Sequence, residues 1–214
     1  MLFLTTWRRR FVFTSLLWKG RRFTHVISLY QGNIRTVKDI FTIPQKEVYD
    51  KLHHHIGIIS DTHIPHFKKL PVAIWEHFAG VELIIHAGDL SVLSVISKLE
   101  TIAPVVAVQG NIEEDEVVLK LPIKREVVVG FCRIGIVHIL GDSHNRVKVA
   151  RQEFPDAHCV VFGHSHIPWN EDRDGQLLFN PGSATDRRRQ PNCSIGLLYV
   201  DDEAGSVQGE IIWV

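Results

Sequence analysis

The sequence predicts an α/β protein in which two mixed sheets pack face to face and helices cover their outer surfaces, a four-layer α/β/β/α sandwich. Short apolar runs alternate with amphipathic segments between residues 55 and 111. This alternation is typical of parallel strands joined by right-handed helical crossovers. Further β-rich runs follow from residue 125 to the C-terminus, and they supply the strands of a second sheet.

In the first part of this pattern, apolar runs that end in polar residues predict strands, and segments of helical spacing predict the helices between them. Pro71 in the first turn and Gly80 at the end favour the first helix, and Ser91 is the expected N-cap of the second. The predicted strands are 55–63, 81–89 and 103–111, and the predicted helices are 70–80 and 91–100.

The second part is richer in strands. Two β-rich runs touch at Gly130 and predict a hairpin. An amphipathic helix ended by Pro155 comes next, followed by a buried strand and a strand-rich tail. The ranges are 125–130 and 132–139 for the hairpin, 145–154 for the helix, 157–166 for the buried strand, and 176–184, 194–200 and 207–214 for the tail.

Residues 1–52 differ from the rest of the chain. They hold ten Lys and Arg against three Asp and Glu, while residues 53–214 hold fourteen against twenty-one. The first segment shows no clean strand or helix period, which is compatible with a flexible basic arm, a mitochondrial-type targeting segment or a start codon placed too far upstream. We expect a basic N-terminal extension at 1–52, disordered or spurious, and one domain at 53–214.

The composition, with 45% apolar and 22% charged residues, is that of an ordinary soluble protein. No apolar stretch approaches the ~20 residues that span a bilayer, so no membrane partner is expected. Three scattered cysteines, Cys132, Cys159 and Cys193, fit a reducing compartment and a cytoplasmic protein. The mildly acidic body argues against nucleic acid as a partner.

Polar side chains with metal-binding chemistry follow the apolar runs of the predicted strands. Each motif alone has an ordinary reading as a turn, a surface histidine or a core histidine. Their occurrence in one order, each at a strand end, predicts that they converge on one rim, because ligand sites form at the carboxyl ends of parallel strands. They are Asp61 and His63 in SDTH, Asp89 in HAGD, Asn111 in QGN, His138 in GIVHI, and His164 and His166 in GHSH.

Aspartate, asparagine and histidine without thiolate suit divalent ions such as Mn²⁺, Fe²⁺, Ni²⁺ or Zn²⁺ in a reactive site rather than a structural zinc. Seven donors are about the number that two metals sharing a carboxylate require. Such metal pairs, ~3.5–4 Å apart, recur in enzymes that cleave phosphate esters. The rim is therefore predicted to be a two-metal site.

The order Asp-x-His, Gly-Asp, Gly-Asn, His, Gly-His-x-His resembles that of the calcineurin-like metallophosphoesterase superfamily. The segment FNPGSAT at 179–185 resembles the small bacterial and archaeal phosphodiesterase branch of that superfamily. The resemblance covers roughly residues 56–214. It implies that one metal is held by Asp61, His63 and His166, that the other is held by Asn111, His138 and His164, and that Asp89 bridges them.

The resemblance further implies a metal-dependent phosphoric ester hydrolase, in the first place a phosphodiesterase, in which a metal-bridging hydroxide attacks a small phosphate ester in line. Asp89, Asn111 and His138 would be catalytic by positioning the hydroxide and the phosphate. Two divalent ions per chain are implied, Mn²⁺ foremost, with Ni²⁺, Fe²⁺, Co²⁺ or Zn²⁺ as alternatives.

Two departures from the family pattern leave the general acid unassigned. Ile112 stands where many relatives carry a histidine after the Gly-Asn asparagine. The run HILGDSH keeps His138 but lacks the second histidine of the usual His-Gly-His, and His144 is the candidate substitute. The basic loop DRRRQ at 186–190 either attracts a phosphate substrate or is simply solvated.

Two other functions stay open at this point. The same fold serves as a protein-binding scaffold in the retromer subunit that resembles these enzymes, where metal-site residues are degraded. Here all seven positions keep side chains able to bind metal, which favours catalysis. A nuclease would use the same chemistry but needs a basic groove, which the acidic body lacks unless residues 1–52 supply it. The sequence is also compatible with a homo-oligomer.

Overall fold

The structure is a computed structural model that describes residues 10–18, 21–29, 53–65 and 69–214. The chain divides into two compact units, 1–51 and 52–214. In the first unit, β1 (Arg10–Trp18) and β2 (Arg21–Leu29) form an antiparallel pair. The expectation that residues 1–52 are an extension outside the main domain stays a prediction.

The first sheet of the second unit contains three parallel strands, extended by an antiparallel pair from the end of the chain. Its strand order is β12-β11-β3-β4-β5, with β3, β4 and β5 parallel and β11 antiparallel to both β3 and β12. The carboxyl ends of β3, β4 and β5 therefore meet at one edge. The strands are β3 (His53–Ile59), β4 (Leu83–His86), β5 (Val105–Ala107), β11 (Ser194–Asp201) and β12 (Ser206–Trp213).

The second sheet has the order β6-β7-β8-β10-β9. The β6–β7 pair is the hairpin that the sequence predicts, β7, β8 and β10 are parallel, and β9 is antiparallel to β10. The carboxyl ends of β7 and β8 thus point the same way. The strands are β6 (Lys124–Val129), β7 (Cys132–Val137), β8 (Cys159–Val161), β9 (Trp169–Arg173) and β10 (Gln176–Asn180).

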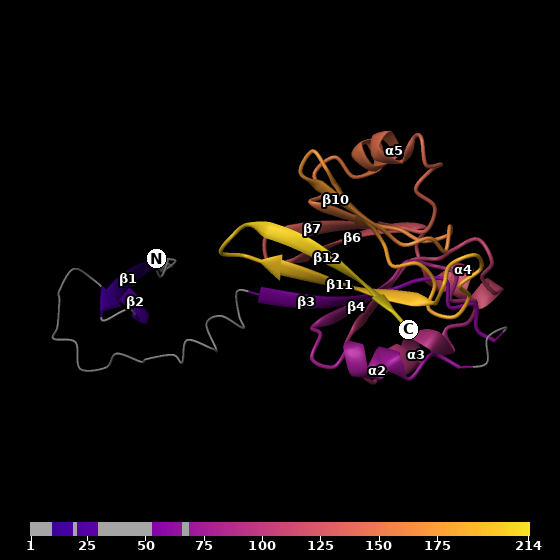
Figure 1. Cartoon of the computed structure of the whole chain (residues 1–214), viewed down its shortest axis with the longest axis horizontal. Coiled ribbons are helices and arrows are strands. Elements are labelled where there is room, and N and C mark those ends of the chain that lie inside the picture. Colours follow the sequence, from indigo (N-terminus) through magenta and orange to yellow (C-terminus); the bar gives the residue numbers. More distant parts are fainter. Residues whose placement is uncertain (1–9, 19–20, 30–52, 66–68) are drawn as a thin grey trace, which may run out of the picture. The chain divides into compact units, whose positions relative to one another are not determined.

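The two sheets pack face to face, with α2 and α3 on the outer side of the first and α5 on the outer side of the second (Figure 1). An inner apolar layer that includes Ile58, Ile134 and Phe179 lies between the sheets, and two further clusters lie beneath the helices. The predicted four-layer α/β/β/α sandwich is confirmed. The helices are α2 (Ala73–His77), α3 (Ser94–Leu99), α4 (Asp115–Lys120) and α5 (Arg146–Glu153).

Local structure differs from the sequence prediction at three places. Helix α4 forms in the acidic run after Asn111, and β9 forms in the charged segment WNEDR; neither segment has a clear apolar period. Ser91 is not a helix cap, because α3 begins at Ser94 after Leu93. Ser91 instead has left-handed backbone, with φ of 68°, and its N–H is bound by Glu113.

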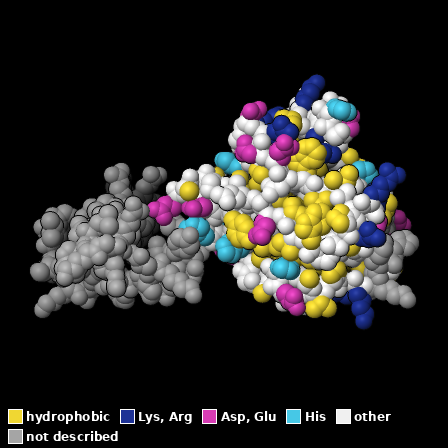
Figure 2. Space-filling view, viewed as in Figure 1, with side chains coloured by type: hydrophobic (Ala, Val, Ile, Leu, Met, Phe, Trp, Pro, Cys, Tyr) yellow, Lys and Arg dark blue, Asp and Glu magenta, His cyan; other side chains and the backbone are white. Residues whose placement is uncertain are grey.

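The surface of the second unit mixes both signs of charge with apolar side chains. On the face shown in Figure 2, Asp and Glu, Lys and Arg, and His side chains are interspersed among hydrophobic ones. None of the helices in the described part of the chain is long and apolar enough to cross a bilayer.

Phe179 tests the inner layer, because its side chain is fully buried between the sheets. Phe179→Ala should lower the free energy of unfolding by about 3–5 kcal/mol through lost burial and a residual cavity. Val128→Ala is the control: that side chain is 60% exposed, and its truncation should cost less than about 0.5 kcal/mol. Urea denaturation followed by far-ultraviolet circular dichroism measures both. Equal losses for the two variants would contradict the assigned core.

His54 at the start of β3 gives the fold a pH dependence. Burial tends to lower its pKa, but Glu82 at 2.8 Å and Asp202 at 3.3 Å outweigh burial and raise the pKa above the ordinary 6.5. Its charged form therefore stabilises the fold below pH 6.5, and this contribution is lost as the pH rises through the folded-state pKa.

His54→Gln should consequently destabilise the metal-free protein more at about pH 6 than at about pH 8.5. The measurement is the urea midpoint of both proteins across that range in the presence of chelator, which keeps metal binding out of the comparison. A difference between the two proteins that does not change with pH would show that the ion pairs of His54 contribute nothing.

Candidate metal centre

The seven predicted metal-binding residues follow strands whose carboxyl ends lie at one edge of the sandwich. Contacts between side chains of the two sheets, such as His63 with His166 and Asn111 with His138, show that the donors meet there. Asp61 and His63 follow β3, Asp89 follows β4, Asn111 follows β5, His138 follows β7, and His164 and His166 follow β8.

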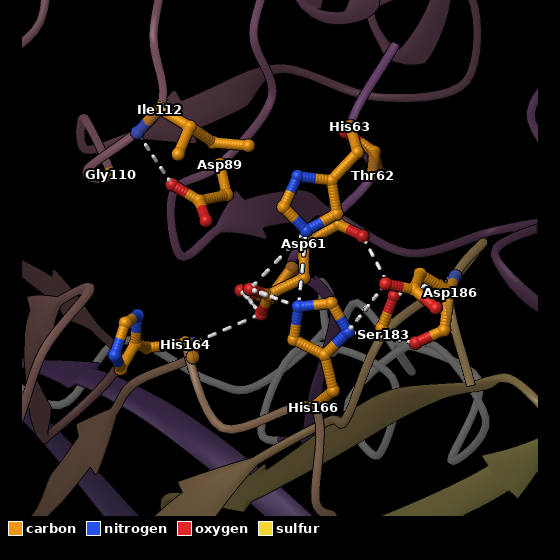
Figure 3. Close-up of polar contacts among 12 residues, drawn as sticks. Asp61, Thr62, His63, Asp89, Gly110, Ile112, His164, His166, Ser183 and Asp186 are labelled. Carbon is orange, nitrogen blue, oxygen red and sulfur yellow. Dashed lines mark hydrogen bonds and ion pairs between the residues drawn. The ribbon is translucent and has the colours of Figure 1, made fainter. Parts of the chain in front are cut away.

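A first donor group consists of Asp61, His63 and His166, whose donor atoms all lie within 4.8 Å of one another. Nε2 of His63 lies 3.0 Å from Nε2 of His166, and the latter atom lies 3.2 Å from Oδ1 of Asp61. Figure 3 shows the two imidazole rings facing each other beside the carboxylate. All three residues are buried.

A second donor group consists of Asp89, His138 and His164, again within 4.8 Å of one another. Oδ2 of Asp89 lies 3.3 Å from Nε2 of His138. Oδ1 of Asn111 lies 3.1 Å from that same nitrogen and 2.8 Å from Nδ1 of His164. The asparagine oxygen therefore lies beside this group, and its assignment as a ligand stays a prediction.

The donor set fits cations. Oδ1 of Asp61 is fully buried and accepts no hydrogen bond in the described part of the chain, and a buried carboxylate oxygen needs a positive partner. Carboxylate, carboxamide and imidazole donors without thiolate suit divalent ions. Asp89 belongs to the second donor group, and the charge of its carboxylate also acts on the His63 ring of the first group.

The backbone at five of the seven positions is in the left-handed region, which is unusual for residues other than glycine. Such conformations cost about 1–3 kcal/mol each and persist only where the surroundings enforce them, which is common at functional sites. The φ values are 53° at Asp61, 46° at His63, 56° at Asp89, 68° at His164 and 59° at His166.

The segment after β10 holds the loop of Asp61 and His63 in place. The Ser183 hydroxyl donates to the carbonyl of Asp61 at 2.7 Å, and the Thr185 hydroxyl donates to the carbonyl of Thr62 at 2.7 Å. Both donors belong to FNPGSAT, the segment singled out in the sequence. This segment thus supports the first donor group from the neighbouring sheet.

Glycine is required before two of the ligands because the neighbouring loops approach closely. A Cβ atom at Gly163 would overlap the Ser60 hydroxyl and lie 2.8 Å from Oδ2 of Asp61. At Gly110 it would overlap the carboxylate and backbone nitrogen of Asp89. The Gly-Asn and Gly-His pairs are therefore steric requirements of the centre.

Glu113 has a place in the centre that the sequence does not predict. Its carboxylate accepts N–H bonds from Leu90 at 3.2 Å, Ser91 at 2.5 Å and Gly110 at 2.8 Å. In return, Oδ1 of Asp89 accepts N–H bonds from Asn111 at 2.8 Å and Ile112 at 3.2 Å. The two carboxylates brace the two loops against each other, and the only sequence signal is the acidic run after Asn111.

Hydrogen bonds from the second ring nitrogen orient two of the histidines. His138 donates from Nδ1 to the carbonyl of Ala87 at 2.7 Å, and His166 donates from Nδ1 to the carbonyl of Asp186 at 2.7 Å. Since each Nδ1 carries a hydrogen, the neutral form of each ring presents the lone pair of Nε2 to its donor group. This is the usual way in which proteins orient metal-binding imidazoles.

The pKa shifts of the donors differ in direction, and those of His63, His164 and Asp89 favour cation binding. Burial tends to lower the pKa of His138, but its hydrogen bond with Asp89 and the charge of Asp61 outweigh burial and raise that pKa. Burial lowers the pKa values of His63 and His164, so both rings are neutral near pH 7. Burial alone would raise the pKa of Asp89, but the hydrogen bond of His138 and the N–H of Asn111 outweigh it and lower that pKa. Neutral imidazole and ionised carboxylate are the forms that bind metal.

The structure assigns no general acid. Ile112 lies beside the centre and is 45% exposed. His144 is on the exposed loop before α5 and belongs to neither donor group. His86 is fully buried next to the Thr62 hydroxyl, and burial lowers its pKa to about 3, so it remains a neutral core histidine.

An α/β/β/α sandwich with paired Asp and His groups at its strand ends defines the class of metal-dependent phosphoesterases. Residues 55–203 match the calcineurin-like phosphoesterase superfamily domain, and the chain belongs to that superfamily. The family uses divalent metals, and the two donor groups are two candidate metal sites in this chain.

Two curated relatives and one solved structure illustrate the similarity. A probable metallophosphoesterase of Methanothermobacter thermautotrophicus is 36% identical over 162 residues, 73% of this chain and 91% of the relative. A phosphodiesterase of Methanocaldococcus jannaschii is 30% identical over 138 residues, 59% of this chain and 82% of the relative. The crystal structure of a Vps29 single mutant from Entamoeba histolytica superposes with a TM-score of 0.60 at 24% identity, covering 75% of this chain and 99% of that one.

Removal of the Glu113 carboxylate should loosen the Asp89 loop without removing a donor. Glu113→Ala should weaken metal binding by about 10–100-fold, the usual effect of losing a group that orients a ligand. Glu113→Gln should retain part of the affinity, because its carbonyl oxygen still accepts N–H bonds. Calorimetric titration of the metal-depleted protein with Mn²⁺ measures the affinity of each variant. An unchanged affinity in the alanine variant would contradict the bracing role.

Proposed function

We propose that this protein is a phosphodiesterase that depends on two divalent metals and hydrolyses a small phosphate ester. The observation that carries the proposal is the pairing of two donor groups at one rim, each with one carboxylate and two imidazoles. Asp61, His63 and His166 would hold one ion. Asn111, His138 and His164 would hold the other, with Asp89 between them.

Two cations held by these residues would supply an activated water at neutral pH and would neutralise charge on the reacting phosphate. The residues of the chain hold and orient the reacting groups. Asp89, Asn111 and His138 fix the position at which the phosphate is attacked, because their donor atoms are anchored by the loop bonds of Glu113 and by the carbonyl of Ala87. Such fixed groups lower the barrier because they need no rearrangement during the reaction.

The diester preference and the metal rest on narrower support. The relative from Methanocaldococcus jannaschii is named as a phosphodiesterase, and we extend that activity to this chain. Mn²⁺ is the proposed ion because oxygen and nitrogen donors without thiolate suit it, with Ni²⁺, Fe²⁺, Co²⁺ and Zn²⁺ as the competitors to test.

We also propose a cytoplasmic location. The three cysteines are free, and Cys132 and Cys159 are buried in the core between the sheets, which is the usual state of thiols in a reducing compartment. The small phosphate ester is the proposed partner, and association of identical chains is a separate question for sedimentation.

The full chain is first depleted of metal with a chelator and then supplied with one divalent metal at a time. It should hydrolyse the diester bis(4-nitrophenyl) phosphate faster than the monoester 4-nitrophenyl phosphate. Asp89→Asn and His164→Ala should each lower the rate by more than about 100-fold, because even groups that only orient ligands account for 10–100-fold. Release of 4-nitrophenolate measures the rate, and calorimetry gives the number of ions bound.

Two control variants make the same substitutions at residues that are not predicted ligands. Asp156→Asn and His77→Ala change exposed residues outside both donor groups and should keep full activity. A protein that binds no metal would refute the enzyme and favour the protein-binding scaffold. Two bound ions without turnover of either ester would refute the proposed activity and leave only the metal centre.

A further inference from the structure

Two cavities that differ in charge border the candidate metal centre. One is about 240 Å³ and includes Asn111 and His138 in its wall. The other is about 290 Å³ and includes His166 in its wall. Since each wall contains predicted metal ligands, a phosphate at the centre would extend its two ester arms towards these two cavities.

The cavity beside His166 is basic. Its wall contains three consecutive exposed arginines, Arg187, Arg188 and Arg189, together with Ser165, Ile167 and Gln190. The loop of three arginines carries one carboxylate, that of Asp186, which lies 3.6 Å from Nε of Arg188. The loop therefore keeps a net positive charge.

This loop is fixed to the centre. The Asp186 carbonyl accepts the Nδ1–H bond of His166, and its carboxylate lies 3.4 Å from the same nitrogen, as Figure 3 shows. The Ser183 hydroxyl accepts the N–H of Asp186 at 2.9 Å.

The cavity beside Asn111 is apolar. Ile123, Val137 and Ile139 form its wall, and the side chains of Ile123 and Ile139 are largely exposed. Gln109 adds a carboxamide, but its NH₂ group already donates to the carbonyl of Leu121 at 2.7 Å. The wall contains neither Lys nor Arg, so it favours an uncharged, flat or apolar group.

We propose that the preferred substrate is a phosphodiester with one arm that carries a further phosphate, held by Arg188 and the adjacent arginines, and with an uncharged aromatic or apolar arm held by Ile123 and Ile139. The inference rests on the proposed function and narrows its substrate class. Arg188 is the specificity-determining residue, because guanidinium groups bind phosphate oxygens in a bidentate manner.

Two chromogenic phosphodiester probes differ only in the additional phosphate on one arm. They are thymidine 5′-(4-nitrophenyl phosphate) and its 3′-phosphorylated counterpart, and both release 4-nitrophenolate. With the full chain and the best metal, kcat/KM should be about five- to tenfold higher for the 3′-phosphorylated probe, a modest gain because exposed charges are screened by water. The gain should shrink between low and high salt.

Arg188→Gln should lower kcat/KM for the 3′-phosphorylated probe more than for the other probe, and Arg188→Lys should restore part of the difference. Arg133→Gln is the matched control, since Arg133 is an exposed arginine at the opposite end of β7 from His138 and should leave both rates unchanged. A binding readout accompanies the kinetics: the metal-loaded protein should bind thymidine 3′,5′-bisphosphate more tightly than thymidine 5′-phosphate in calorimetry, and Arg188→Gln should remove the difference.

The outcomes separate the two proposals. Hydrolysis of both probes with equal kcat/KM, together with equal affinities for the two nucleotides, overturns the substrate preference and leaves the phosphodiesterase intact. An equal loss in Arg133→Gln also overturns it, because the effect would then reflect overall charge. Hydrolysis of neither probe with any metal overturns the proposed function and the substrate preference together.

Discussion

The burial of the Asp61 carboxylate is the constraint on which the arrangement of the centre depends. The side chain has no exposed surface. One oxygen accepts hydrogen bonds from the Ser60 hydroxyl and the His164 amide, and the other faces Nε2 of His166. A buried charge is tolerated only with compensating partners, so both sheets direct donors towards it. The rim of the sandwich is organised by that requirement.

A single loop connects the orientation of a predicted ligand with the proposed substrate preference. Asp186 fixes the ring of His166 through its carbonyl and carboxylate, and the same carboxylate pairs with Arg188. The position of the arginine is therefore tied to the position of a predicted metal ligand. On the other side of the centre, Asn111 borders the apolar cavity, and its amide N–H is bound by Asp89. The groups proposed to bind the two substrate arms would thus be held at fixed positions relative to the centre.

The sequence predicts the two-sheet fold and the seven donors because each donor follows an apolar run, and strand ends of parallel sheets meet at one edge. It does not predict the role of Glu113, because an acidic run after a turn is usually a solvated surface. The sequence pattern wrongly predicts Ser91 as a helix cap. The backbone N–H of Ser91 instead donates a hydrogen bond to the carboxylate of Glu113, 22 residues away. Helix α4 and strand β9 lack an apolar period, so only tertiary contacts reveal them. The two cavities are likewise formed by loops whose approach no local pattern encodes.

Each donor group contains residues from both sheets, so metal binding and the stability of the fold are linked. Asp61 and His63 come from the first sheet and His166 from the second, while Asp89 and His138 join the sheets in the other group. An ion bound at either position would cross-link the two sheets at the edge of the sandwich. Because a ligand that binds only the folded state stabilises it, the fully loaded protein would melt at a higher temperature than the chelated one. Loss of a ligand would then reduce activity and melting temperature together, whereas a change in the arginine loop would reduce selectivity and leave the melting temperature where it was.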